Sequence, residues 1–355
     1  MPASRSNPDS TNAFTFPAPD LDVLHDPGHE QAAARAERVR DAAPATPLRI
    51  GDAEVRVGTA SWTDPTLLQS GLFYPPHAND AESRLRYYAE RFSMVEVDSS
   101  YYALPTPGMA ALWSERTPAH FRFNLKAHAL MTGQPTDPAR LPKILRDELP
   151  RPLAGKARLY PADLPPEILD AVWALFIDAL QPLRNSGRLG AVILQYPRWF
   201  VPSRAAAQAL TDARDRLDGV AGAVELRNHR WFRDAERQDR LLRFLERESL
   251  PFVMVDGPQG LESSVPPVVA VTSPRLAIVR LHGRRTDAWE ARGVATVERY
   301  RYLYDRDQLA QWADRVVDVA SRSERVHVTL NNCHGNYGTA NAIELRALLQ
   351  ERATG

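Results

Sequence analysis

The 355-residue chain has little of several things that would place it quickly in a protein class. Its one cysteine, Cys333, excludes an intramolecular disulfide framework or an all-cysteine metal site, and it fits a reducing compartment. Net charge is also missing: 44 Lys+Arg balance 44 Asp+Glu, which argues against a general nucleic-acid coat or a membrane-surface protein. No apolar run approaches the roughly 20 residues that cross a bilayer, and no secretory signal is visible in 1–19. We therefore expect a soluble, cytoplasmic protein.

Lysine is equally scarce. Only three of the 44 basic residues are lysines, namely Lys126, Lys143 and Lys156. We attribute the bias toward arginine to genome composition. A lysine held at a special position of the fold is informative for the same reason.

Residues 1–50 differ in texture from the rest of the chain. Up to Pro27 they are polar and interrupted by proline, and residues 30–41 have a helix-forming composition with little apolar stripe. We predict a poorly ordered, largely irregular extension over 1–50 with one marginal helix, followed by a single domain over 51–355.

From Val55 onward, short runs of β-branched and aliphatic residues alternate with helical patterns. Eight runs joined mostly by helices predict a parallel sheet, and the count of eight favours a closed (β/α)8 TIM barrel in the α/β class. No phosphate-binding glycine fingerprint follows the first run, which removes the main sequence argument for an open nucleotide-binding sheet. The predicted strands are 55–61, 94–99, 121–128, 190–196, 222–227, 252–256, 277–282 and 326–331.

The predicted strands are striped, and this is their most informative property. Strands buried on both faces usually read as continuous apolar runs, but here aliphatic residues often alternate with polar ones. Side chains in a strand alternate faces, and the outer face of a barrel must be apolar to hold its helices. The polar set is therefore expected to face the lumen. It contains Glu96, Asp98, Lys126, Gln195, Glu225, Arg227, Asp256, Arg280, His282 and Asn331.

Buried charges are costly unless they are paired, bound to a metal or neutralised. Four carboxylates and three cations are predicted in the lumen, so the set can pair internally, with His282 able to balance it. One interpretation is an ion-pair plug that merely fills the barrel. The other is an active site, which is favoured because the polar residues cluster toward the carboxyl ends of the strands, where barrel enzymes place their chemistry.

Several of these segments, taken in order with their loops, resemble the DUF72 (YecE-like) family of uncharacterised TIM-barrel proteins. The resemblance covers Val55 to Leu349 and implies the barrel but no established reaction. Its matching pieces are Val57–Trp62, Phe73–Pro76, Val95–Tyr102, Trp113 with Thr117 and Pro118, Phe121–Lys126, Gln195–Pro197 with Phe200, Val224–Arg227 with Trp231, Arg280–Arg284, Tyr300–Tyr304 with Trp312, and Asn331–Asn332 with Asn341–Ala342.

The carboxylates suggest acid/base work. Glu96 and Asp98 share one face of a strand, about 7 Å apart, and Glu225 is able to converge on them. Such a cluster suits general acid/base catalysis if its neighbours push the carboxyl pKa values apart. A single divalent metal is the alternative, with His282 and Asp256 as further ligands, but the neighbouring cations argue against it.

The cations suggest an anionic ligand. Arg227, Arg280 and Arg284 can grip a phosphate or carboxylate bidentately. Lys126 is a candidate for stabilising an oxyanion or forming a Schiff base, or for a plain salt bridge to Glu96 or Asp98. Amides able to orient a ligand come from Gln195, Asn331 and Asn332, and aromatic walls from Trp62, Tyr101, Tyr102 and Tyr337. We designate Glu96, Asp98, Lys126, Glu225 and His282 as candidate catalytic residues, and Trp62, Tyr102, Gln195, Arg227, Arg280, Arg284, Asn331 and Asn332 as candidate substrate-binding residues.

Two long connections are able to cover the mouth. Residues 128–165 are a proline-rich lid candidate, and residues 283–304 interleave arginines with aromatics, a pattern that can read single-stranded nucleic acid.

Three functions remain open from the sequence. The favoured one is an enzyme for a small anionic or polyhydroxylated substrate. The others are a metal-assisted phosphodiesterase acting on nucleic acid, which rests on fold analogy, and a non-catalytic ligand-binding barrel. No cofactor is predicted beyond the possible metal, no membrane partner is expected, and the oligomeric state is undetermined.

Overall fold

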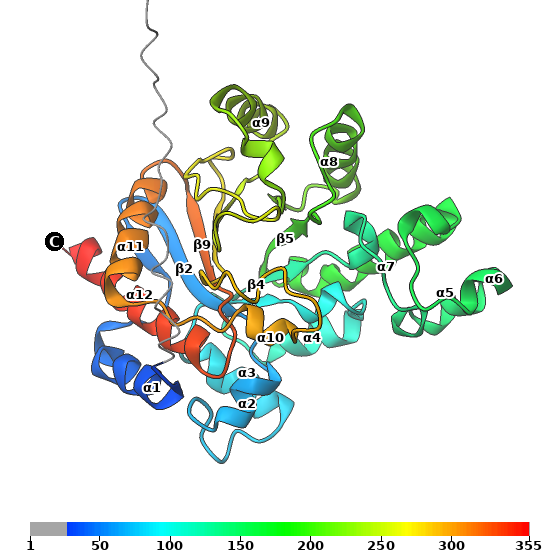
Figure 1. Cartoon of the computed structure of the whole chain (residues 1–355). Coiled ribbons are helices and arrows are strands. Elements are labelled where there is room, and N and C mark those ends of the chain that lie inside the picture. The colour runs from blue at the N-terminus through cyan, green and yellow to red at the C-terminus, as the bar shows by residue number, and fades with distance from the viewer. Residues whose placement is uncertain (1–26, 355) are drawn as a thin grey trace, which may run out of the picture.

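The computed structural model describes residues 27–354 and shows eight parallel strands that form a nearly closed barrel with helices around it (Figure 1). Neighbouring strands pair in the order β6-β5-β4-β3-β2-β9-β8-β7, and β1 pairs antiparallel with β2. The two ends of this path meet at a bridge between Val224 and Phe252, where the Val224 amide donates to the Pro251 carbonyl at 2.8 Å. The predicted α/β barrel is confirmed.

All eight predicted strands are present, within a few residues of their predicted limits. The short strand β1 (Leu48–Ile50), in the segment predicted to be irregular, was not anticipated. The barrel strands are β2 (Ala53–Ala60), β3 (Met94–Val97), β4 (Arg122–Lys126), β5 (Leu189–Gln195), β6 (Gly222–Glu225), β7 (Val253–Asp256), β8 (Ala277–Leu281) and β9 (Arg325–Leu330).

Helices follow most of the strands and cover the outside of the sheet (Figure 1). The connection between β7 and β8 has no helix. The helices are α1 (His29–Arg38), α2 (Pro65–Ser70), α3 (Ala81–Ala89), α4 (Pro107–Glu115), α5 (Lys143–Asp147), α6 (Arg151–Ala154), α7 (Pro166–Asn185), α8 (Arg204–Arg216), α9 (Ala235–Arg247), α10 (Thr296–Arg299), α11 (Arg306–Ala320) and α12 (Tyr337–Thr354). No helix within residues 27–354 is long and apolar enough to cross a membrane.

The segment before the barrel contains a real helix rather than a marginal one. Helix α1 packs on α12, and Arg35 fixes it there by an ion pair from Nε to Glu344 Oε1 at 2.9 Å. A second bond from Arg35 Nη2 reaches the Tyr304 carbonyl at 2.6 Å. The prediction of a largely irregular extension covers residues 1–50: its part over 27–50 contains α1 and β1, and its part over 1–26 lies outside the described residues.

Strand register decides which side chains face the lumen. Residues paired across parallel strands point to the same face, and the pairs Arg56–His327, Ala60–Glu96, Gln195–Glu225 and Arg280–Thr329 follow one face around the barrel. The alternate residues, such as Val95, Leu125 and Val328, are fully buried in the main apolar core that includes the outer helices. The predicted division into an apolar outer face and a polar lumen is therefore confirmed for most positions.

Small residues make room for this polar filling. A Cβ at Gly190 would lie 2.3 Å from Oδ1 of Asn124 and 3.0 Å from Cε1 of His327, so this position of β5 accepts only glycine without a shift of its neighbours. The lumen also holds an apolar patch that includes Ala191, Ile193 and Val253. Polar filling is thus concentrated in particular sectors of the barrel rather than spread evenly.

Candidate active site

The carboxyl ends of the strands carry a connected group of polar side chains that we call the mouth network. Arg280 stands at its centre, with its Nη2 on Glu96 Oε1 and its Nη1 on Glu225 Oε2. All three side chains are essentially inaccessible to solvent. One guanidinium thus neutralises parts of two carboxylates from different strands. The network consists of Glu96, Gln195, Glu225, Arg227, Arg280, His282 and Asn331.

Glu225 receives the densest set of partners. Arg227 Nε donates to its Oε1 at 2.5 Å, and His282 Nε2 lies 3.3 Å from the same oxygen. Burial alone would raise the pKa of Glu225, but the charges of Arg227 and Arg280 outweigh it and hold the pKa well below its usual value. Glu225 is therefore a permanently ionised carboxylate that orients its neighbours.

The pKa of Glu96 is shifted in the opposite direction, although Glu96 shares the same arginine. Burial raises its pKa despite the opposing charges of Arg280 and Lys126. Its second oxygen, Oε2, is buried and has no hydrogen-bond partner among residues 27–354. The two buried glutamates thus have pKa values pushed apart, which is the condition that the sequence argument set for acid/base work.

His282 is buried and neutral. Its pKa is lowered to about 3, first by burial and then by the charge of Arg227. Asn331 Nδ2 lies 2.7 Å from its Nδ1, while Arg227 Nη2 and Glu225 Oε1 lie 3.0 and 3.3 Å from its Nε2. His282 is thus a neutral hydrogen-bonding partner of Arg227, Glu225 and Asn331 rather than a cation.

Lys126 lies at the end of β4, half-buried beside the mouth network. Among residues 27–354 no carboxylate oxygen comes within 4 Å of its ammonium, so the salt bridge to Glu96 or Asp98 considered from the sequence is not formed. The ammonium instead lies 4.4 Å from the ring centre of Tyr101. Burial, followed by the charge of Arg280, lowers the pKa of Lys126 to about 8.

Asp98 follows β3 at the rim and is also half-buried. Burial raises its pKa, the charge of Lys126 opposes this, and Asp64 adds to it. Unlike Glu96 and Glu225, Asp98 forms no ion pair with any residue in 27–354. Asp98 and Lys126 are therefore the two candidate catalytic groups whose charges are not already committed to a protein partner.

Two loops complete the rim. Gln134, from the first lid candidate, accepts a hydrogen bond from the Tyr101 hydroxyl at 2.9 Å and donates to the Gln195 carbonyl at 2.9 Å. From the second loop, Trp289 lies 5.2 Å from the Arg227 guanidinium, and its ring and that of Tyr300 lie about 6 Å from His282. Sequence reasoning missed Gln134 entirely, since a single amide in a long irregular loop carries no signal.

Four of the predicted residues lie apart from the mouth network or at its edge. Trp62 packs edge-on against Trp113 at 5.9 Å and belongs to the core around α4. Asn332 is buried and ties the Tyr302 carbonyl to the Asn341 side chain. Tyr102 is 44% exposed beyond the rim and contacts Arg140. Arg284 turns away from the network toward Asp256.

The prediction that Asp256 faces the lumen is wrong. In the register of β7 and β8, Val255 pairs with Arg280 and Asp256 pairs with Leu281, which belongs to the outer core. Asp256 instead binds Arg284, whose Nε lies 3.0 and 3.1 Å from its two oxygens. This outward ion pair separates Arg284 from the two arginines with which it was grouped.

The barrel and its mouth define the class of protein, a TIM barrel with an ionic lumen. Its charged groups without an ion-pair partner among the described residues, Lys126 and Asp98, lie at the carboxyl ends of the strands, where barrel enzymes bind substrates. The sequence profile described as "Protein of unknown function DUF72" matches residues 56–355. The chain therefore belongs to the DUF72 family, as the motifs indicated.

Individual relatives agree with this assignment. The chain is 27% identical to the UPF0759 protein YunF of Bacillus subtilis over 304 residues, which cover 85% of this chain and 96% of YunF. It is 29% identical to the UPF0759 protein YecE of Escherichia coli over 152 residues, 41% of this chain and 50% of YecE. The crystal structure of a DUF72 protein from Thermotoga maritima superposes with a TM-score of 0.64 at 26% identity, covering 83% of this chain and 98% of that one. A DUF72 protein from Enterococcus faecalis gives a TM-score of 0.65 at 24% identity, covering 83% and 95%.

Proposed function

We propose that the chain is an enzyme that acts on a small anionic or polyhydroxylated substrate by proton transfer at the mouth of the barrel. The observation that carries this proposal is the state of Lys126. Its amine has a pKa lowered to about 8 and no carboxylate partner within residues 27–354, in a lumen where the other buried cations are paired. An amine near its pKa at working pH is suited to proton transfer or to stabilising a developing oxyanion.

The division of labour follows from the charges. Lys126 and Asp98 transfer protons, since neither is held by an ion pair. Glu96, with a raised pKa and one unbonded oxygen, is a second acid. Glu225 stays ionised and fixes Arg227, Arg280 and His282 as a rigid support, so we assign it a positioning role.

Substrate binding is assigned to the accessible parts of the same group. Arg227 is held by Glu225, by Gln195 Oε1 at 3.2 Å and by His282 Nε2 at 3.0 Å, and we assign its guanidinium to the anionic group of the substrate. Asn331 and Gln195 supply amides for hydroxyl or carbonyl oxygens, while Trp289 and Tyr300 form an aromatic wall beside His282. This combination suits a sugar-like molecule that carries one phosphate or carboxylate.

The other functions stay predictions from the sequence. In the part of the chain that the structure describes, no group of three or more His, Cys, Asp and Glu side chains is placed to hold a metal ion. A metal bound between Glu96 and Glu225 would have to displace Arg280. No specific observation favours the phosphodiesterase or the non-catalytic barrel, and a cytoplasmic location likewise rests on the sequence alone.

The test is exchange of substrate hydrogen with solvent. The protein is incubated in D2O with sugar phosphates and hydroxy acids, and deuterium gained at the carbon beside the carbonyl or carboxylate is followed by NMR. Lys126→Met should reduce exchange by about 100-fold or more, in keeping with the loss of a general acid or base. In the parent protein, exchange should rise with pH through about 8, because the neutral amine is the base.

The chain offers a matched control in Lys143→Met. Lys143 is an exposed lysine on α5 that pairs with Asp147, and its replacement should leave exchange unchanged. Full exchange in Lys126→Met, or no exchange by the parent protein with any member of this substrate class, would refute the proposal.

A further inference from the structure

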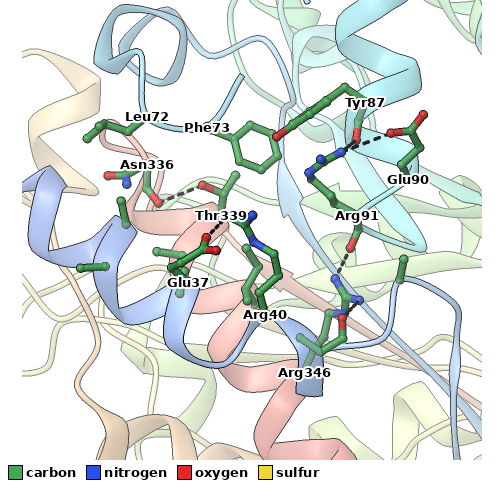
Figure 2. Close-up of a pocket in the computed structure, with 17 residues that line it drawn as sticks. Glu37, Arg40, Leu72, Phe73, Tyr87, Glu90, Arg91, Asn336, Thr339 and Arg346 are labelled. Atoms are coloured by element: carbon green, nitrogen blue, oxygen red, sulfur yellow. Dashed lines mark hydrogen bonds and ion pairs between the residues drawn. The ribbon is translucent and has the colours of Figure 1, made fainter. Parts of the chain in front are cut away.

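A cleft lies away from the mouth of the barrel, between α1, α12 and the segment that runs from α2 to α3 and beyond. This cleft has a volume of about 570 Å3 (Figure 2). Figure 2 shows Phe73 and Tyr87 on one side and Glu37 and Arg40 of α1 on the other, with Thr339 between them. Helix α1 precedes residues 56–355, so one wall of the cleft lies outside the family match.

The walls of the cleft are mostly apolar. Helix α1 presents alanines such as Ala33 and Ala36, helix α12 presents Ala340 and Ile343, and Phe73 faces them from the opposite side. Small side chains on α1 and α12 keep the space open. Binding sites for small molecules commonly have this size and this apolar lining, with a few polar groups that fix the orientation.

Three arginines line the cleft, and two of them have carboxylate partners. Arg40 pairs with Glu37 one turn earlier on α1. Arg91 pairs with Glu90 at 3.3 Å and stacks on Tyr87, with its guanidinium carbon 3.2 Å from the ring centre. These two arginines therefore add no net charge to the cleft.

Arg346 is the exception. Its side chain is buried, at 3% exposure, and its Nη1 and Nη2 donate to the carbonyls of Arg91 and Ala43. Among residues 27–354 it forms no ion pair, and burial lowers its pKa only to about 10, so it remains charged at neutral pH. A carbonyl group accepts a hydrogen bond without neutralising a cation, so the cleft contains one uncompensated positive charge beside an apolar surface.

We propose that this cleft binds an amphiphilic carboxylate, with the carboxylate beside Arg346 and an unbranched apolar chain along the alanine face of α1 and α12. A single negative charge matches the single uncompensated cation, and a guanidinium recognises a carboxylate by paired hydrogen bonds. The apolar chain gains by leaving water against Phe73 and Ile343. The site is separate from the mouth of the barrel and independent of the function proposed there.

The experiment compares decanoate with 1-decanol by titration calorimetry on the full chain. The two probes share the apolar chain and differ in charge. Decanoate should bind at one site, and 1-decanol at least about tenfold more weakly, the loss expected when a buried charge pair is replaced by a neutral contact. Equal affinities, or no saturable binding of decanoate, would overturn the proposal.

Variants locate the site. Ile343→Trp fills the cleft while keeping the Arg346 guanidinium and should abolish decanoate binding, while Arg346→Met should bring decanoate down to the affinity of 1-decanol. Arg352→Met is the matched control, since Arg352 lies on the same helix and pairs with Asp314 outside the cleft. Should Arg346→Met fail to fold, Ile343→Trp and the comparison of the two probes still decide the question. Decanoate binding that survives Ile343→Trp places the ligand elsewhere and contradicts the assignment.

Discussion

The two ends of the barrel lumen both bury polar side chains, but they do so differently. At the amino ends of the strands lies a floor cluster of Arg56, Asn124 and His327. Arg56 donates to the carbonyls of Ser93 and His120 and pairs with Glu54 at 2.8 Å, while Asn124 Oδ1 lies 3.0 Å from His327 Nδ1. The mouth network at the opposite end shares Arg280 between two carboxylates and leaves Lys126 beside it without one.

The difference distinguishes buried polar groups that only close the barrel from buried polar groups that are available to a ligand. Arg56 is the one cation of the floor cluster; it pairs with one carboxylate, that of Glu54, and backbone carbonyls accept its other hydrogen bonds. The floor cluster therefore closes the barrel without spare charge. The mouth keeps an amine and a carboxylate, of Lys126 and Asp98, that no partner in residues 27–354 neutralises. Charged side chains that have no ion-pair partner, at the carboxyl ends of barrel strands, are typical of binding and catalytic sites.

The largest expected effect comes from Arg280→Met. Both Glu96 and Glu225 then lose a buried cation, and breaking a buried ion pair on one side costs about 3–5 kcal/mol. The free energy of unfolding, measured by chemical denaturation, should fall by at least this amount. The triple change with Glu96→Gln and Glu225→Gln should recover part of the loss, and a single variant as stable as the parent would show that the network is not the support described here.

A smaller effect is expected from Arg56→Met in the floor cluster. Its carboxylate partner, Glu54, is half-buried and can be hydrated, so the loss is mainly two unsatisfied carbonyls and should cost about 1–3 kcal/mol. Hydrogen exchange on a substrate should stay at the parent level. A loss as large as that of Arg280→Met would remove the distinction between the two ends of the barrel.

The smallest effect on stability, with the opposite sign, is expected from Lys126→Met. The pKa of Lys126 is about 8 in the folded chain, below its ordinary value, so the unfolded chain holds the proton more tightly. The native state is therefore penalised below pH 8 and relieved as pH rises through the two pKa values. The variant should be more stable by about 1 kcal/mol at pH 7, after allowance for its partial exposure, and the gap should close above roughly pH 10. Denaturation at both pH values measures it, and a variant less stable at pH 7 would contradict the lowered pKa.

Much of this architecture was predictable because the period of a strand is exact. Glu96, Lys126, Glu225 and Arg280 face the lumen as their alternation with aliphatic neighbours requires. The alternation rule gave the wrong face for one residue of β7, the strand at one end of the pairing path. Asp256 lies at the last residue of β7, one position out of phase with the lumen set, and the sequence around it has no charged neighbour on the strand to reveal the phase.

The prediction that Arg284 joins Arg227 and Arg280 was wrong for a related reason. It follows Gly283, which adopts a left-handed φ of 86° and packs so closely on Tyr302 that a Cβ would lie 2.6 Å from that residue's own. The chain turns there, so alternation no longer fixes the side-chain direction. Ion-pair partners could not be predicted from the sequence either. The alternation shows that Lys126 and Glu96 face the lumen, but only the structure shows that Arg280 pairs with Glu96 and that Lys126 has no carboxylate partner within residues 27–354. The cleft beside α1 was equally invisible, since alanines give no apolar stripe.

Gln134 connects the first lid loop to the electrostatics of the rim. It holds the Tyr101 hydroxyl with its side-chain oxygen and the Gln195 backbone with its nitrogen, and the Tyr101 ring lies under the Lys126 ammonium. Displacing the loop would break both bonds and admit water to the amine, and because burial is the main cause of the lowered pKa of Lys126, that pKa would move back toward the value of an ordinary lysine. The position of the loop would thereby tune the pKa of Lys126: with the loop in place the amine gives up its proton at a lower pH than it would with the loop displaced.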